Sequence, residues 1–365
     1  MISEDRNTLT FLKLIRLGIG HTVDVMPSSV DWGEMKGLAE QQGLGALVLD
    51  GVEVLRTNGS LNESLNMPDK LFLTQWIGEV LQGYDYRYDL YRRAIGELAG
   101  FYNAREIKLM VIKGYACSVD WPRPEHRPCG DIDIWLFGQQ KGADTLLEKE
   151  KRVEIDSSHH HHTVFFWHDF MVENHYDFVN VYHHKGNIRL EKEFKRLATD
   201  DTHFVEINGE RVYLPSPNLH VLFLLKHTLN DFTSFSMTLR QVLDWAFHLK
   251  KHGGEIDWNW LLGILEEFHM TDFFNCLNAI CVEELGFEPG IFHGVQFNPV
   301  LLSRVLDDIF YPKYSRSCPL GLLPRLAYKY KRWKGNGWKH ELCYRESRWK
   351  SFWILLWSHL IKPKV

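Results

Sequence analysis

The stretch "PCGDIDIWLF", residues 128–137, decides the fold because two aspartates stand in an otherwise apolar run. Its apolar content predicts a buried strand, in which an unpaired carboxylate is costly. Residues two apart in a strand share a face, so Asp131 and Asp133 project together while Ile132 and Ile134 face the core. A bound metal ion is one partner that would compensate two such carboxylates.

A third carboxylate lies farther along the chain in "FMVENHYDF" (170–178), where Glu173, His175 and Asp177 share one strand face. Glu173 has apolar neighbours, as the two aspartates do, so we take it as the third carboxylate and Asp177 as the alternative. Such a set suits two divalent ions roughly 4 Å apart, an arrangement that transfers phosphoryl and nucleotidyl groups. The competing interpretation is that D-x-D marks only the solvated face of an edge strand.

The segments around the two aspartates predict mixed α/β structure from 107 to 182. In chain order they are a strand (107–112), the turn Lys113-Gly114, a helix opened by residues 115–121, a proline-rich loop carrying Arg127, the aspartate strand, a charged helix, and strands at 162–167 and 170–182 joined by His168-Asp169. Patterns of helical spacing precede and follow this region, with one helix predicted to start at Pro217.

This order of parts resembles the nucleotidyltransferase superfamily that includes DNA polymerase beta, and within it the bacterial branch of uncharacterised nucleotidyltransferases. That branch reads roughly "LKG", then "R-x-x-D-I-D", then "V-E-L-H"; the counterparts here are "VIKG" (111–114), "RPCGDID" (127–133) and "VENH" (172–175). The resemblance implies an α+β fold, a small mixed-sheet core flanked by N- and C-terminal helical regions. We expect a helical region at 1–105, the nucleotidyltransferase core at 106–214, a helical domain at 215–310 and a basic, aromatic-rich tail at 311–365.

The resemblance further implies an enzyme that moves an NMP from an NTP to an acceptor hydroxyl with Mg²⁺ or Mn²⁺. Asp131 and Asp133 would hold the ion bound to the triphosphate, and Glu173 would join them on a second ion. The implied substrate-binding residues are Lys113, Gly114, Tyr115, Arg127, Gly130, His175, Arg240 and Asp244. Tyr115 departs from the superfamily, which often has Ser or Gly there, so the clearance given by a small residue is absent.

Histidines crowd the region from 159 to 184, including the tract His159–His162. Adjacent histidines in a strand point to opposite faces, so four in a row cannot all bind one zinc ion. We therefore predict that the tract fills a strand with polar side chains. His175 differs, because it shares the face of Glu173 and is expected to orient that carboxylate or to contact substrate.

The composition of the chain narrows its class. A formal charge of −5 gives no general case for binding nucleic acid. The six cysteines are scattered without a C-x-x-C, which indicates reduced, structural thiols. The N-terminus lacks the pattern of a signal peptide, and no apolar run reaches membrane-spanning length. These features favour a cytoplasmic protein.

The last 55 residues, 311–365, hold thirteen Lys and Arg against Glu341 and Glu346, a net charge of +11. Basic residues interleaved with aromatics can contact RNA or an anionic membrane, or the tail can pack on the acidic remainder of the chain. The four-residue spacing of Trp349, Trp353 and Trp357 favours packing.

Two other functions fit the sequence. One is a catalytically inactive nucleotide-binding or regulatory module with the same fold. The other is a helical protein that uses the basic tail on RNA or at a membrane surface. The acceptor of an active enzyme is equally open, since a sugar, an antibiotic, a protein hydroxyl and a tRNA end all fit.

Overall fold

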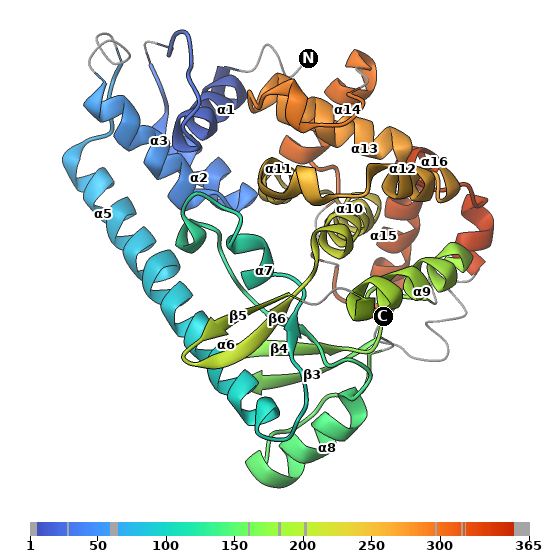
Figure 1. Cartoon of the computed structure of the whole chain (residues 1–365). Helices are drawn as coiled ribbons and strands as arrows, with labels where there is room; N and C mark the ends of the chain where they lie inside the picture. The colour runs from blue at the N-terminus through green and yellow to red at the C-terminus, as the bar shows by residue number, and fades with distance from the viewer. Residues whose placement is uncertain are drawn as a thin grey trace. The chain divides into compact units, whose positions relative to one another are not determined.

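The computed structural model describes residues 6–353 except 28, 59–64, 160, 182–183, 201–202, 296–297, 315–316 and 318. The chain forms two compact units, each built from segments distant in sequence (Figure 1). The sheet unit comprises Asp85–Phe223, Glu255–Asp257 and Glu346–Val365. The helical unit comprises Met1–Tyr84, Leu224–Gly254 and Trp258–Arg345.

The sheet unit contains one mixed sheet, with six strands in the described part of the chain in the order β3-β4-β2-β1-β6-β5. The strands are β1 (Met110–Val111), β2 (Ile132–Trp135), β3 (His162–Trp167), β4 (Phe170–His175), β5 (His203–Ile207) and β6 (Glu210–Leu214). β2 pairs antiparallel with β1 and parallel with β4, while β1 pairs parallel with β6. The mixed sheet, with helical regions before and after it in sequence, confirms the predicted α+β class.

The apolar residues that alternate along these strands form the core of the sheet unit. Ile132 and Ile134 of β2 and Val172 of β4 are fully buried, as the alternation predicts. They share this core with α6 (Arg87–Asn103), which packs against β6, and with α8 (Gln140–Lys151) (Figure 1). Burial of these side chains stabilises the sheet, and the alternation places Asp133, Glu173 and His175 on the opposite face of β2 and β4.

The lengths of several predicted elements differ from those observed. The strand predicted at 107–112 is only Met110–Val111, and the helix predicted after Gly114 is one turn, α7 (Tyr115–Ser118). β3 has the predicted bounds, and the predicted connection at His168-Asp169 is confirmed as a two-residue hairpin turn. β4 ends at His175 rather than at 182. The amides of Tyr176 and Asp177 both donate to the carbonyl oxygen of His161, so the pairing with the segment before β3 does not advance beyond Tyr176.

Sequence reasoning missed three elements of the sheet unit: α9 (Lys185–Asp200), β5 and β6. A signal for the strands was present, since Asn208-Gly209 separates two alternating segments and is a strong hairpin signature. Both turn residues have positive φ, 54° and 82°. Since β6 pairs with β1, this hairpin extends the sheet beyond the strands that the sequence predicted.

The helical unit contains most of the remaining helices. They are α1 (Arg6–Gly18), α2 (Trp32–Gln42), α3 (Gly45–Thr57), α5 (Lys70–Val80), α11 (Leu239–His252), α12 (Trp258–Glu267), α13 (Thr271–Ala279), α14 (Pro299–Phe310), α15 (Leu322–Gly335) and α16 (Gly337–Cys343). α10 (Pro217–Ser234) begins at the predicted proline and contributes residues to both units. α1 and α3 cross closely at Gly51, where a Cβ would overlap the carbonyl oxygen of Leu14, so only glycine fits there.

The basic tail divides between packed and exposed parts. In α16, Lys339 is fully buried and Trp338 packs on Phe232. Trp349 and Trp353 are instead 55% and 62% exposed, so the prediction that they pack on a core is wrong, and Trp357 lies outside the described residues. The described helices include none with the length and apolar character needed to cross a membrane.

The cysteines behave as predicted wherever the structure describes them. Cys117, Cys129, Cys276, Cys281 and Cys343 are buried and form no disulfide. Burial raises the pKa of Cys276 to about 12, which keeps that thiol protonated and unreactive at neutral pH.

Candidate active site

The two aspartates lie at the start of β2, in the interior of the sheet. Asp133 is the second residue of the strand and only 4% exposed, whereas Asp131 precedes the strand by one residue and is half-buried. The prediction that the strand begins at Asp131 is therefore wrong by one residue. Instead of joining the ladder, the Asp131 carbonyl oxygen accepts a hydrogen bond from the Tyr91 hydroxyl at 2.8 Å.

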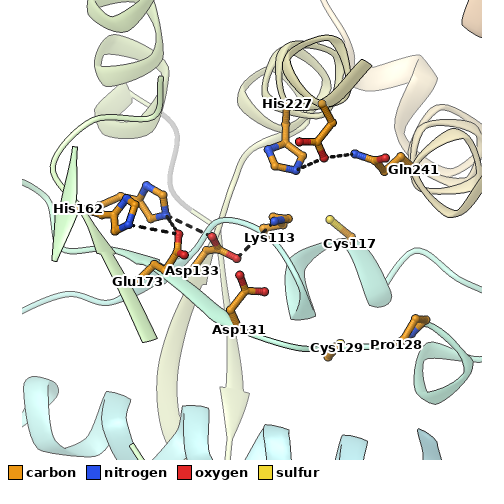
Figure 2. A network of polar contacts seen from close by, with 12 residues as sticks. Lys113, Cys117, Pro128, Cys129, Asp131, Asp133, His162, Glu173, His227 and Gln241 are labelled. Carbon is orange, nitrogen blue, oxygen red and sulfur yellow. Dashed lines mark hydrogen bonds and ion pairs between the residues drawn. The ribbon is translucent and has the colours of Figure 1, made fainter. Parts of the chain in front are cut away.

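Glu173 lies directly beside Asp133, because β2 and β4 pair in parallel with these two residues in register. Neighbours in register turn their side chains to the same face of a sheet, and Figure 2 shows the carboxylates of Glu173, Asp133 and Asp131 on adjacent backbone segments. His175 Nε2 lies 3.2 Å from Asp133 Oδ1 and 3.4 Å from Glu173 Oε2. Asp133, Glu173 and His175 thus offer ligand atoms within 4.8 Å of one another.

The carboxylates of this cluster perturb one another. Burial raises the pKa of Asp131, and the charges of Asp133 and Glu173 raise it further, against the opposing effect of Lys113. Burial also acts to raise the pKa of Glu173, but the hydrogen bond from His175 leaves that pKa below its usual value. Three crowded carboxylates are the oxygen ligands that Mg²⁺ prefers, so the donor set fits a hard divalent cation.

His175 is the cationic partner of two of these carboxylates. Burial acts to lower the pKa of His175, but its hydrogen bonds to Asp133 and Glu173 outweigh that effect and raise the pKa to about 9. The sequence-based expectation that His175 orients Glu173 agrees with this contact. The contact with Asp133 was not foreseen, since it depends on the register of β2 against β4.

The turn between β1 and α7 brings Lys113 to the cluster. Lys113 Nζ lies 4.0 Å from Asp133 Oδ2 (Figure 2). Gly114 has φ 58°, a left-handed conformation, and a Cβ there would overlap the Tyr91 hydroxyl. Tyr91, fully buried on α6, therefore contacts the Lys113-Gly114 turn and Asp131 together, and no sequence motif had indicated it.

Three other predicted substrate residues surround the turn and the loop before β2. The ring of Tyr115 is buried and stacks on Tyr88. The side chain therefore lies in the core of the sheet unit and does not fill the clearance that a Ser or Gly at this position would give. Arg127 is 2% exposed and donates to the Pro128 carbonyl oxygen at 3.2 Å, so it supports the loop before β2. Gly130 is exposed, and a Cβ there would meet open space.

The remaining predicted residues lie elsewhere. Asp177, the alternative third carboxylate, follows β4 and is paired with Lys195 of α9 at 2.5 Å. Arg240 and Asp244 lie on α11, which belongs to the helical unit, so their contact with a nucleotide stays a prediction.

The histidine tract differs from its prediction. Of its described members, His159, His161 and His162, only His162 lies in a strand, since β3 begins there, and the argument from alternating strand faces fails for the other two. His162 pairs directly with His175 across the β3–β4 hairpin, and its Nε2 lies 4.0 Å from Glu173 Oε2. Burial and the charge of His175 lower the pKa of His162 to about 4. The two-residue turn at His168-Asp169 was the signal that could have revealed this register.

Comparison with known proteins identifies the family of this chain. The profile of the family described as "Uncharacterised nucleotidyltransferase" matches residues 28–286. The chain therefore belongs to the uncharacterised nucleotidyltransferase family, which supports nucleotidyl transfer as its general activity. No curated protein matches the sequence.

One solved structure is similar to part of the chain. It is titled "Crystal structure of an antigenic nucleotidyltransferase-like protein from Paracoccidioides brasiliensis". The match has 16% sequence identity and a TM-score of 0.32, and it covers 44% of this chain and 75% of that one.

Proposed function

We propose that this protein transfers a nucleotidyl group from an NTP to an acceptor hydroxyl, at the site formed by Asp131, Asp133 and Glu173. In that reaction the acceptor oxygen bonds to the α-phosphorus, the bond to the leaving pyrophosphate breaks, and the hydroxyl proton is lost to solvent. The observation that carries the proposal is the parallel register that sets Glu173 beside Asp133, with Asp131 two residues away. It also favours Glu173 over Asp177, which is paired with Lys195.

The carboxylates would hold the divalent ions, as in the superfamily that includes DNA polymerase beta. Asp131 and Asp133 would hold the ion that accompanies the triphosphate, and Glu173 would complete a second position. Bound Mg²⁺ or Mn²⁺ would neutralise phosphate charge and lower the pKa of the acceptor hydroxyl. The mutual repulsion that raises the pKa of Asp131 in the ion-free protein is relieved by such a charge.

The other residues of the site would position substrate and ligands. Lys113 supplies a positive charge next to Asp133, where phosphate oxygens would lie. Gly114 permits the left-handed backbone that brings Lys113 there. His175 holds the Asp133 and Glu173 carboxylates through Nε2. Arg127, Arg240 and Asp244 are proposed nucleotide contacts from the resemblance alone.

Binding and transfer together separate this proposal from its alternatives. Each of the four NTPs, labelled at the α-phosphate, is incubated with Mg²⁺, the full chain and fractionated cell extract, while NTP binding is measured by calorimetry. We expect binding with one preferred NTP and a labelled acceptor that disappears when a chelator is added. Binding without any labelled acceptor would favour an inactive regulatory module. Failure to bind any NTP with Mg²⁺ would favour an interaction protein that uses the basic tail on RNA or a membrane.

A further inference from the structure

The histidines beside the carboxylate cluster form a second group of metal-ligating side chains. His161, His162 and His175 each offer a ring nitrogen within 4.8 Å of a ring nitrogen of the other two. Their rings are close as well, with centroids 4.4 Å apart for His161 and His162 and 5.2 Å apart for His162 and His175. They come from two places in the sequence, which the β3–β4 hairpin brings together.

Two of these rings present a buried nitrogen that has no hydrogen-bond partner among the described residues. His162 and His175 are 7% and 8% exposed, and the Nδ1 atom of each is buried and unpartnered. A buried polar atom without a partner is costly. Such an atom therefore requires an explanation, and a bound ion is one.

The opposite nitrogen of each of these two rings faces a carboxylate. His175 Nε2 donates to Asp133 and Glu173, and His162 Nε2 lies 4.0 Å from Glu173 Oε2 (Figure 2). A metal-binding histidine almost always donates its other ring N–H to a carboxylate, a carbonyl or water, which fixes the tautomer and the ring orientation. His175 shows this arrangement, with Nδ1 left for an ion.

We propose that His161, His162 and His175 bind one Zn²⁺-like transition-metal ion, at a site separate from the oxygen-ligand site for Mg²⁺. Imidazole nitrogen suits Zn²⁺, Co²⁺ and Ni²⁺, whereas Mg²⁺ prefers oxygen. Three protein ligands leave the fourth tetrahedral position to water. Coordination at His175 Nδ1 replaces the proton there and leaves the Nε2 proton to the carboxylates. This inference goes beyond the proposed transfer reaction and does not depend on it.

Cobalt provides a direct probe of this site. Full-length protein without an added histidine tag is freed of metal with a chelator and titrated with Co²⁺, while visible absorption is recorded. We expect one Co²⁺ per chain, with the intense bands of a four-coordinate ion, displaced by Zn²⁺ and not by excess Mg²⁺. A protein that binds no Co²⁺ under these conditions would overturn the inference.

Substitutions then show whether these three histidines are the ligands. His162→Gln and His175→Gln should each weaken Co²⁺ binding more than about tenfold, since even loss of a partner outside the ligand set costs roughly 10–100-fold. His168→Gln is the matched control, because His168 is on the same hairpin, exposed and hydrogen-bonded to Glu97. His161→Gln, outside the strands, gives the same readout if a strand variant fails to fold. Unchanged Co²⁺ binding in folded His175→Gln would mean that the tract binds alone, and the proposed site would be wrong.

A further variant distinguishes the test of metal binding from the test of nucleotidyl transfer. Asp131→Asn should abolish nucleotidyl transfer but retain Co²⁺ binding, because Asp131 is not one of the three ligands. If the wild type shows no transfer, the cobalt result still stands. If it binds no Co²⁺, the proposed transfer reaction is not affected.

Discussion

Two groups of buried charged side chains in this protein differ in whether their positive and negative charges neutralise each other. In the helical unit, Lys339 is fully buried, and its Nζ lies 2.6 Å from Asp308 Oδ2 and 2.6 Å from the Phe235 carbonyl oxygen. Burial lowers the pKa of Lys339 and raises that of Asp308, but each ion faces its opposite. The pair is complete within the chain.

The cluster in the sheet unit is not balanced in the same way. Lys113 lies 4.0 Å from Asp133, and His175 lies close to Asp133 and Glu173, while burial together with like charge raises the pKa of Asp131. In a structural ion pair the two charges neutralise each other, whereas a site that binds external cations retains excess negative charge. This difference is the basis for assigning a structural role to Asp308 and for proposing a ligand role for Asp131.

Breaking the balanced pair should have the largest effect on stability. Lys339→Met leaves the Asp308 carboxylate buried without its partner, which we expect to lower the free energy of unfolding by about 3–5 kcal/mol. Chemical denaturation measures this change. Arg56→Met is the control, because the exposed Arg56–Glu53 pair is screened by water and its loss should change the free energy of unfolding very little. Equal losses in both variants would show that the buried pair has no special role.

The stability of the ion-free protein should fall at alkaline pH through His175. Its folded-state pKa of about 9 lies above the usual 6.5, so its contribution is complete below about pH 6.5 and is lost as the pH rises through about 9. The shift corresponds to a contribution on the order of 3 kcal/mol. In a chelator, the melting temperature should fall more steeply between pH 6.5 and 9 for the wild type and His168→Gln than for His175→Gln. Parallel curves for all three would contradict the assigned contacts.

Gly114→Ala should destabilise the turn that carries Lys113. An alanine at φ 58° is strained by about 1–3 kcal/mol, and its Cβ would also overlap the Tyr91 hydroxyl. Gly130→Ala is the matched control, since a Cβ there meets open space. Adding Tyr91→Phe to Gly114→Ala should recover part of the loss by removing the overlap. No difference between the two alanine variants in denaturation would mean that the turn is not constrained.

Neutralising Asp131 should have the smallest effect, and of opposite sign. Because burial and like charges raise its pKa, the ionised form is disfavoured in the folded protein, and stability falls as the pH rises through that titration. Asp131→Asn should therefore melt at the same temperature as the wild type or slightly higher, near neutral pH with a chelator present. A large loss of stability would give Asp131 a structural role like that of Asp308.

The sequence predicted which residues of β2 and β4 share a face better than it predicted their surroundings. Alternation placed Ile132 and Ile134 in the core and Glu173 on the same face as His175, because those inferences need only the period of a strand, while the apolar neighbours of Glu173 favoured it over Asp177. The contacts of Tyr91 and the approach of His162 to His175 depend on residues distant in sequence that only the fold brings together. Asp308 in "VLDDIF" resembles Asp133 in "DIDIWLF", and only the position of Lys339 tells a structural acid from a candidate ligand.

The most direct test of this account compares the two carboxylates at the end of β4. With a labelled NTP and Mg²⁺, Glu173→Gln should reduce transfer to the acceptor by about a hundredfold or more, the cost of removing one group that stabilises transition-state charge. Asp177→Asn should retain most of the activity, because Asp177 is paired with Lys195. Circular dichroism should show both variants folded. Full activity in folded Glu173→Gln, or its loss only in Asp177→Asn, would contradict the assignment of the site.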